Sequence, residues 1–271
     1  MGKRVFPVIA LGPFELRSYF VVMALALAVP MFYAPRRAEK ILPEKARDFG
    51  NMLLFMYLSA LVGFRLFYVA FVLPDYFWAH PLEIFKVWKG GFVAYGGLFL
   101  PVAVFMVWVW WKKMPALLTA DILAPSIVLV FAVARVACFL NGCCFGKPTQ
   151  GIFGVVFPPG SVAHRFYPGA SLHPTQLYLS VSALVVYGVI MLFETKLRRY
   201  YFKGLSSAIF LVLYPLSRFI VEFYRADFRG GMFFGLSVSQ CLSLLLIALG
   251  AAVFVKGRER GFPASPSAAK T

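Results

Sequence analysis

The sequence predicts an all-α integral membrane protein with about seven transmembrane helices. Hydrophobic residues make up 61% of the 271 residues, and the mean hydropathy is +0.79, which is far above the values of soluble domains. Seven apolar runs each approach the ~20 residues that cross a bilayer as a helix. Runs of this length indicate helices rather than barrel strands, because only a backbone with internal hydrogen bonds can cross lipid.

Basic residues separate the seven runs and mark their ends. Lys and Arg number 3 before the first run, then 5, 2, 2, 2, 4 and 2 in the successive connections, and 4 after the last run. The first 17 residues contain no apolar core of a cleavable signal peptide, so the first run is expected to be a retained span. The expected spans cover residues 18–34, 50–73, 92–111, 120–140, 175–193, 205–224 and 233–255.

The distribution of basic residues predicts the topology of the chain. The eight segments outside the spans alternate between the two sides of the membrane. The four segments on one side, beginning with the connection after the first span, hold 15 Lys and Arg, and the four on the other side hold 9. The positive-inside rule then places the N-terminus outside and the C-terminus in the cytoplasm. We expect a single polytopic domain over residues 1–256, with a long outward-facing loop at 141–174, and a disordered cytoplasmic tail at 257–271, which is rich in Ser, Pro and Ala.

The formal net charge of +16 does not indicate nucleic-acid binding, because the basic residues gather at helix ends instead of on a soluble face. Three arginines, however, lie inside expected spans: Arg65, Arg135 and Arg218. A charge at this depth costs about 3 kcal/mol on insertion scales, so it normally faces a protein interior or a wet cavity. The missing negative charge is most simply a bound anion, and the guanidinium fork suits the phosphate of a phospholipid.

The segment from Tyr214 to Asp227 carries the strongest pattern. Arg218, Glu222 and Arg225 follow the i, i+4, i+7 spacing of one helix face, where Glu222 could orient both arginines. Charge avoids lipid, so a functional polar site is favoured over a lipid-facing salt bridge.

A second polar site is predicted where the fourth span ends. Arg135 precedes Asn141-Gly142 and Gly146-Lys147-Pro148, which break the helix, and irregular backbone at this depth is tolerated only around a cavity. Cys138, Cys143 and Cys144 lie in the same stretch. We interpret them as packing residues, with a redox relay, a disulfide or a metal-ligand set as alternatives. Since their spacing matches no zinc motif, no metal is expected.

Two further motifs leave their interpretation open. Tyr95 stands before Gly96 and Gly97 at the start of the third span, which suits either a backbone-lined pocket or close helix packing. His173 precedes Pro174 at the outer end of the fifth span, where it is either an acid/base or a hydrogen-bonding residue at the helix start.

Taken in order, these motifs resemble the prolipoprotein diacylglyceryl transferase family of bacterial inner membranes. The resemblance runs from about Gly12 to Leu245 through GPFELRSY, FRLFYV, PLEIFKVWKGGFVAYGGL, ARVACFLNGCCFGKPT, HPTQLY and SRFIVEFYR. It implies roles for the functionally important tyrosine, here Tyr19, and for the second-helix arginine, here Arg65. It also matches Arg135, Asn141, Gly142, Gly146, His173, Arg218, Glu222 and Arg225 to the family's motifs.

The chain departs from the resemblance at several positions. Tyr95 stands where the family has a histidine, and Cys138 and Cys143 replace the asparagine and the acidic residue of the signature. The arginines are retained, so lipid binding carries over more readily than proton transfer.

The resemblance implies a multi-pass enzyme of the bacterial inner (cytoplasmic) membrane. It would move diacylglycerol from phosphatidylglycerol to the lipobox cysteine of a preprolipoprotein signal peptide, with release of glycerol 1-phosphate and no cofactor. Its expected catalytic residues are Arg135, Arg218, Glu222 and Tyr95. Its expected substrate-binding residues are Tyr19, Arg65, Asn141, Gly142, Gly146, Arg225, His173, Gly96 and Gly97. The alternatives are a non-catalytic lipid- or lipoprotein-binding paralogue and a membrane thiol-redox protein.

Overall fold

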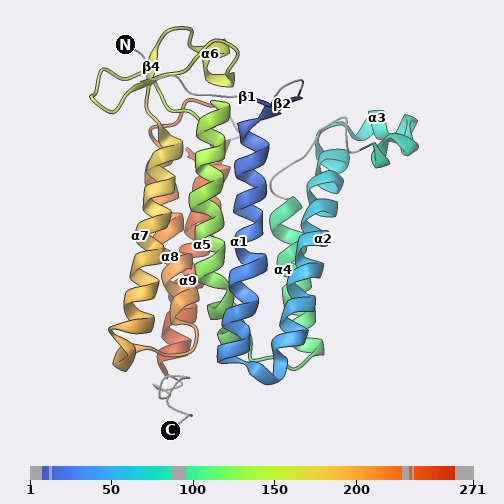
Figure 1. Ribbon diagram of the computed structural model, residues 1–271, viewed down its shortest axis with the longest axis vertical. Helices are drawn as coiled ribbons and strands as arrows, with labels where there is room; N and C mark the ends of the chain where they lie inside the picture. Colours follow the sequence, from blue (N-terminus) through green and yellow to red (C-terminus); the bar gives the residue numbers. More distant parts are fainter. Residues whose placement is uncertain (1–7, 12–13, 87–95, 228–231, 234, 260–271) are drawn as a thin grey trace. The chain divides into compact units, whose positions relative to one another are not determined.

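The computed structural model describes residues 8–11, 14–86, 96–227, 232–233 and 235–259 (Figure 1). Within these residues, six helices are long and apolar enough to cross a membrane, and a seventh apolar helix is shorter. The predicted all-α, multi-pass fold is therefore confirmed. The predicted orientation of the termini stays a prediction.

The chain divides into two compact units, one formed by Met1–Ala34 with Ala120–Thr271 and the other by Pro35–Thr119. Helix α1, Ser18–Ile41, and helix α5, Ala116–Asn141, each contribute residues to both units. We describe these two units one at a time, and the single polytopic domain over residues 1–256 stays a prediction.

The second unit, Pro35–Thr119, is built on two helices that approach closely through glycines. Its elements are α2 (Ala46–Phe71), α3 (Pro74–Ala79) and α4 (Gly96–Trp111), with 3-10 turns at Pro43–Lys45 and Pro81–Phe85. A Cβ atom on Gly63 of α2 would overlap the carbonyl of Gly96 on α4, and a Cβ atom on Gly96 would overlap that of Gly63. Small residues are what allow two membrane helices such a close approach.

The first unit contains the remaining long helices and three short antiparallel hairpins. Its elements besides α1 and α5 are α6 (Val162–Phe166), α7 (Thr175–Thr195), α8 (Leu205–Glu222), α9 (Val238–Glu259) and the hairpins β1–β2 (Val8–Leu11, Phe14–Arg17), β3–β4 (Val155–Val156, Ser171–Leu172) and β5–β6 (Met232–Phe233, Leu236–Ser237). Helix α9 continues to Glu259, three residues into the segment that was expected to be a disordered tail. Residues 260–271 lie outside the described residues.

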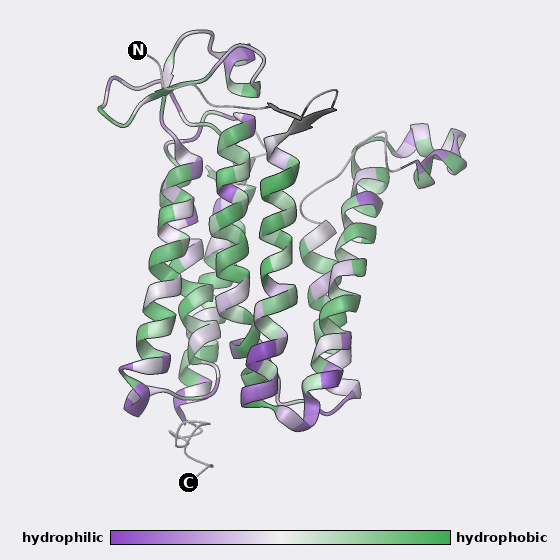
Figure 2. Ribbon diagram, in the orientation of Figure 1, coloured by the Kyte–Doolittle hydropathy of each residue, from purple (hydrophilic) through white to green (hydrophobic). Residues whose placement is uncertain are grey.

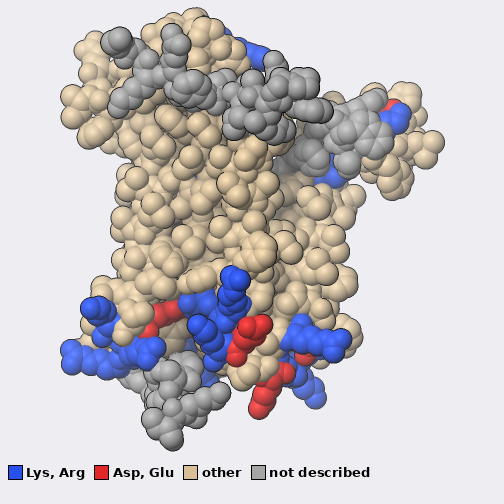
Figure 3. Space-filling view, in the orientation of Figure 1, with Lys and Arg blue, Asp and Glu red and all other residues tan. Residues whose placement is uncertain are grey.

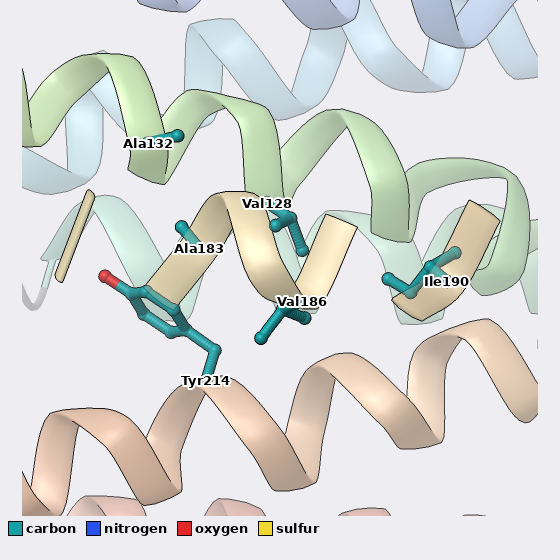
Figure 4. Packing of buried hydrophobic residues seen from close by; sticks show 6 residues of the cluster. All are labelled: Val128, Ala132, Ala183, Val186, Ile190 and Tyr214. Carbon is teal, nitrogen blue, oxygen red and sulfur yellow. The ribbon is translucent and has the colours of Figure 1, made fainter. Parts of the chain in front are cut away.

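The core of the first unit lies where α5, α7 and α8 meet (Figure 4). Tyr214 of α8 stacks on Phe131 of α5 with ring centroids 4.7 Å apart. The buried cluster around this stack consists of Val128, Ala132, Ala183, Val186, Ile190 and Tyr214. The outer faces remain apolar, as on Val181 and Leu245, and Figure 2 shows hydrophobic colour along the length of these helices. A helix that is apolar on its outer face as well as its inner face suits lipid as its solvent.

The end of the first unit that lies away from the loop at 141–174 is charged. Lys and Arg gather where α7 leads into α8 and where α9 ends (Figure 3). The basic residues there include Lys196, Arg198, Arg199, Lys203, Lys256 and Arg258. Under the positive-inside rule this would be the cytoplasmic end, as the sequence predicts.

A buried carboxylate fixes the start of α8 at this charged end. Asp121 of α5 is 1% exposed and accepts hydrogen bonds from the backbone amides of Gly204 and Ser207 and from the hydroxyls of Ser207 and Tyr201, at 2.6–2.9 Å. Burial raises the pKa of Tyr201, and the Asp121 charge raises it further, so the phenol stays protonated and donates. Asp121 thereby satisfies helix-start amides that lack partners inside the helix.

Replacing Asp121 with alanine should lower the free energy of unfolding by about 3 kcal/mol or more, because several buried donors lose their acceptor at once. The measurement is thermal unfolding in detergent, with Asp75→Ala as a matched control, since Asp75 is exposed on α3. Equal melting of the Asp121 variant and the wild type would show that this carboxylate does not hold α8 in place.

Candidate functional site

The signature loop begins where α5 stops at Asn141, as the sequence predicts. Gly142 has φ of +68°, and a Cβ atom there would lie 2.8 Å from the Cβ atom of Ser161. Its carbonyl accepts a hydrogen bond from the amide of Ala163 at 2.9 Å. Gly142 is therefore required both by its backbone conformation and by the close approach of the segment that carries α6.

The same loop is joined to two other segments that carry predicted site residues. The Gly146 amide donates to the carbonyl of His173 at 2.9 Å, and the Lys147 amide donates to the carbonyl of Tyr224 at 2.8 Å. A Cβ atom on Gly146 would lie 2.6 Å from the Cβ atom of His173 and 2.7 Å from the Tyr224 carbonyl oxygen. Gly146 thus lets the loop, the start of α7 and the end of α8 meet at one point.

Glu222 is the centre of the ion-pair network at the end of α8. Its carboxylate accepts a hydrogen bond from Arg218 and another from the hydroxyl of Ser237 at 2.9 Å, and it lies 3.6 Å from Nε of Arg225. Arg218 also donates to the hydroxyl of Ser239 at 3.0 Å. Because Ser237 and Gln240 form a capping box at the start of α9, the network links α8 to α9.

Arg225 joins this network from outside the helix, which corrects one detail of the sequence prediction. Helix α8 ends at Glu222, so Arg225 is not on the same helix face as Arg218. It pairs instead in an isolated β-bridge with Gly146 and donates to both carboxylate oxygens of Asp227 at 2.6–2.9 Å. Its side chain is almost fully buried, and its Nη1 has no hydrogen-bond partner among the described residues.

Arg135 differs from Arg218 and Arg225 because it forms no salt bridge within the described ranges. Its guanidinium lies within electrostatic range of the Tyr214 hydroxyl and of Cys138 and Cys144, and Arg218 lies within electrostatic range of Arg135. The salt bridges found among the described residues pair Arg218 and Arg225 with acids and include none for Arg135.

Among the described residues of this network, three guanidiniums (Arg135, Arg218 and Arg225) lie near two carboxylates (Glu222 and Asp227), which leaves one positive charge uncompensated. This partly buried excess of positive charge, with the Arg225 Nη1 atom that has no hydrogen-bond partner in the described part of the chain, is the electrostatic environment of an anion-binding site.

Tyr19 lies near the three cysteines, two of which, Cys138 and Cys144, are within electrostatic range of Arg135. The phenol of Tyr19, near the start of α1, lies within electrostatic range of Cys138, Cys143 and Cys144. The side chain of Asn141 approaches the thiol of Cys143. Four predicted substrate-binding positions, Tyr19, Asn141, Gly142 and Gly146, are thus found around the end of α5.

The imidazole ring of His173 contacts two tyrosines that are close to it in the structure. Its Nδ1 lies 3.0 Å from the hydroxyl of Tyr178, and its ring packs edge-to-face against Tyr224 with centroids 5.4 Å apart. Tyr178 lies in the first turn of α7, so the imidazole of His173 forms a hydrogen bond at the start of this helix. A role in substrate binding stays a prediction.

Arg65, which belongs to the second unit, has a different environment from the other arginines. It is 6% exposed and donates to the backbone carbonyls of Glu83, Ile84 and Lys86 at 2.8–3.4 Å. Its guanidinium also lies over the rings of Tyr68 and Phe77. Backbone carbonyls and aromatic faces can thus stabilise a buried arginine, where the sequence argument required an anion.

The remaining predicted positions also belong to the second unit. Gly96 and Gly97 begin α4, where Gly96 packs against Gly63 and a Cβ atom on Gly97 would overlap the ring of Phe64. These contacts are the helix packing that was one of the two sequence interpretations. Tyr95 lies outside the described residues.

With this geometry in place, a comparison with known proteins decides the family. A sequence model of the prolipoprotein diacylglyceryl transferase family matches residues 7–256. This chain belongs to that family. The diacylglyceryl transferase match covers both units, from the residues before β1 to the last turns of α9, as the sequence resemblance predicts.

Similar diacylglyceryl transferases come from several bacteria. The chain is 34% identical over 271 residues to the phosphatidylglycerol–prolipoprotein diacylglyceryl transferase of Cupriavidus metallidurans, with 96% of each chain covered. It is 32% identical over 250 residues to the enzyme of that name from Bordetella parapertussis, with 90% of this chain and 92% of the relative covered. It is 32% identical over 288 residues to that of Burkholderia thailandensis, with 93% and 94% covered.

Sequence reasoning missed several partners of the transferase site. Asp227 stands only two residues after Arg225, so a second acid for the arginines could have been suspected from the sequence. Ser237, Ser239 and Tyr214 carry no local signal for contact with a charged group, because their contacts depend on how α5, α8 and α9 pack.

Proposed function

We propose that this chain transfers the diacylglyceryl group of phosphatidylglycerol to the lipobox cysteine of a preprolipoprotein. Membership of the diacylglyceryl transferase family and the names of its relatives support the reaction. The observation in the structure that carries the proposal is the cluster of Arg135, Arg218 and Arg225, in which one positive charge has no compensating carboxylate among the residues that the structure describes. A phospholipid phosphate is the anion that a membrane supplies.

The reaction forms a bond between the acceptor sulfur and the glyceryl carbon of the lipid. The bond from this carbon to the phosphate oxygen breaks, and glycerol 1-phosphate leaves with the electron pair. Negative charge grows on the phosphate in the transition state, so guanidiniums directed at it lower the barrier. We assign this role to Arg135 and Arg218, with Glu222 orienting Arg218 and Arg225 assisting through its Nη1 atom.

The acceptor must react as a thiolate, because the free thiol, with a pKa of about 8.5, is a weak nucleophile. Neighbouring guanidiniums favour the thiolate. Tyr95 is a poor general base, since a phenol has a pKa of about 10, and we assign it to positioning a substrate. The proposed substrate-binding residues remain Tyr19, Arg65, Asn141, Gly142, Gly146, Arg225, His173, Gly96 and Gly97.

The position of the arginine cluster in the first unit indicates on which side of the membrane the reaction takes place. The arginine cluster belongs to the last turns of α5 and to the end of α8, and the loop at 141–174 that follows α5 lies at the opposite end of the first unit from the connection between α7 and α8 (Figure 1). The basic residues gather in that connection. We propose a multi-pass protein of the bacterial inner membrane with this loop on the outer side, where secreted preprolipoproteins arrive.

Replacing Tyr95 with phenylalanine should reduce turnover by only about tenfold, the loss expected for one hydrogen bond of ~1.4 kcal/mol. The reason is that the arginines, and not the phenol, are assigned the thiolate-stabilising role. The rate is measured on folded protein that still binds lipid. A loss beyond about a thousandfold would instead make Tyr95 an essential proton-transfer residue.

A transfer assay tests the proposed function. Purified protein in detergent is incubated with phosphatidylglycerol and a lipobox peptide, and mass spectrometry follows the peptide. The expected result is a peptide heavier by one diacylglyceryl group, with no product from a peptide whose lipobox cysteine is serine. Binding of phosphatidylglycerol without any product would favour a non-catalytic lipid-binding paralogue. Copurification of a quinone, with no transfer, would favour a thiol-redox protein.

A further inference from the structure

Three thiols at the end of α5 form a cluster that the transfer chemistry above does not use. The sulfur atoms of Cys138, Cys143 and Cys144 all lie within 4.8 Å of one another, and those of Cys143 and Cys144 are 3.9 Å apart. In a tetrahedral zinc site with Zn–S bonds of about 2.3 Å, two sulfurs are about 3.8 Å apart. One side of the triangle already has this length, and the other two need to shorten by no more than about 1 Å.

Buried hydrogen bonds hold the backbone that carries two of these thiols. The hydroxyl of Thr175 donates to the carbonyl of Cys144 at 2.6 Å, and Nε2 of Gln176 donates to the carbonyl of Cys143 at 2.7 Å. Both side chains are fully buried at the start of α7. Cys144 has φ of +63°, a conformation that residues other than glycine rarely adopt. Such outer hydrogen bonds orient ligands in protein metal sites.

The cluster is only partly buried, which leaves a route for an ion to enter. Arg135 lies within electrostatic range of Cys138 and Cys144. Cys144 is buried, whereas Cys138 and Cys143 are only partly buried. The close approach of the three sulfur atoms therefore favours the interpretation of these cysteines as metal ligands, although their spacing in the sequence matches no zinc motif.

We propose that Cys138, Cys143 and Cys144 bind a thiophilic divalent cation, Zn²⁺, as three thiolates, and that its fourth coordination position takes the acceptor thiol. The second half of this proposal rests on the proposed function. Catalytic zinc sites hold the ion through three protein ligands and keep one position for water or substrate. A thiol that coordinates zinc is deprotonated, which supplies the nucleophile without a general base.

The step balances without an oxidant or reductant. The acceptor thiol loses its proton to solvent on coordination, and its sulfur supplies the electron pair of the new carbon–sulfur bond. The carbon–phosphate oxygen bond breaks, its electron pair leaves with glycerol 1-phosphate, and the oxidation state of zinc does not change. The position of Arg135 beside the thiols allows the nucleophile and the phosphate to be held side by side.

Metal binding is tested on the full-length protein in detergent, reduced, stripped with chelator and then titrated with Zn²⁺, or with Co²⁺ as a spectroscopic probe. We expect one zinc per chain and an intense thiolate-to-cobalt charge-transfer band. Zinc binding should be weakened at least about tenfold by each of the substitutions Cys138→Ser, Cys143→Ser and Cys144→Ser. Substituting a residue that only supports a metal ligand already lowers metal affinity by about this factor. Cys241→Ser is the matched control, since Cys241 on α9 is outside the cluster, and it should bind as the wild type does.

Three results would overturn the metal site: no binding by the reduced wild type, unchanged binding by the three serine variants, or a disulfide between two of the three cysteines in protein isolated without reductant. The transfer assay distinguishes the activation of the acceptor thiol by zinc from zinc binding itself. Transfer should fall in chelated protein and return with Zn²⁺. Transfer at full rate by metal-free protein would overturn the thiol-activating role and leave the proposed function standing. Stoichiometric zinc binding with no transfer in any metal state would contradict the proposed function and support the metal site alone.

Discussion

Replacing Arg135 with lysine should reduce lipid transfer by about a hundredfold or more, although the positive charge is kept. Arg135 is the guanidinium of the cluster without a carboxylate partner among the described residues, so an anionic substrate is the partner it lacks. A lysine ammonium is a point charge that cannot bind two phosphate oxygens through a planar fork. The measurement is the rate of diacylglyceryl transfer to a lipobox peptide at saturating phosphatidylglycerol.

Arg165→Lys is the matched control for this experiment. Arg165 lies on α6, in the same long loop, but its side chain is exposed. It should keep the wild-type rate. Near-normal turnover of the Arg135→Lys variant would show that Arg135 does not bind the leaving phosphate.

Replacing Glu222 with glutamine should lower both the stability and the activity of the protein. The change removes the charge that compensates Arg218 and lies 3.6 Å from Arg225. Losing one partner of a buried ion pair typically costs about 3–5 kcal/mol. Because the carboxylate also accepts from Ser237 at the start of α9, the loss should loosen the contact between α8 and α9. Thermal unfolding in detergent and the transfer rate report the two effects.

Glu259→Gln provides the comparison, since Glu259 is exposed at the end of α9. This variant should melt and turn over as the wild type does. If Glu222→Gln also had wild-type melting and rate, the ion-pair network would have no role in holding the arginines.

The fold was predictable because a helix that crosses lipid needs a long run of apolar residues, which is easily recognised in the sequence. Long apolar runs, bounded by basic residues, predict the helices, and Asn141-Gly142 predicts the end of α5. The division into two units was not predictable, because it depends on which helices pack together. The glycines that bring α2 and α4 together show this dependence: Gly63 lies in an unremarkable stretch, and its role is visible only opposite Gly96.

The candidate site was predictable where a charge inside an apolar run required an explanation. Arg135, Arg218 and Glu222 were found in this way, and the structure brings them together. The same reasoning gave an incomplete account of Arg65, because backbone carbonyls and aromatic rings can stabilise a buried guanidinium and leave no signature in the sequence. It also overlooked Asp121, a carboxylate near the end of an apolar run whose partners lie more than 80 positions away.

The central claim is that the arginine cluster binds the phosphate that leaves in the reaction. Its most direct test is inhibition by the product, glycerol 1-phosphate, measured for the wild type, Arg135→Lys and Arg165→Lys at fixed phosphatidylglycerol. We expect glycerol 1-phosphate to inhibit the wild type and the Arg165 variant equally, and to bind the Arg135 variant at least about tenfold more weakly, a difference of ~1.4 kcal/mol. Equal inhibition of all three proteins would contradict the assignment of this cluster as the phosphate site.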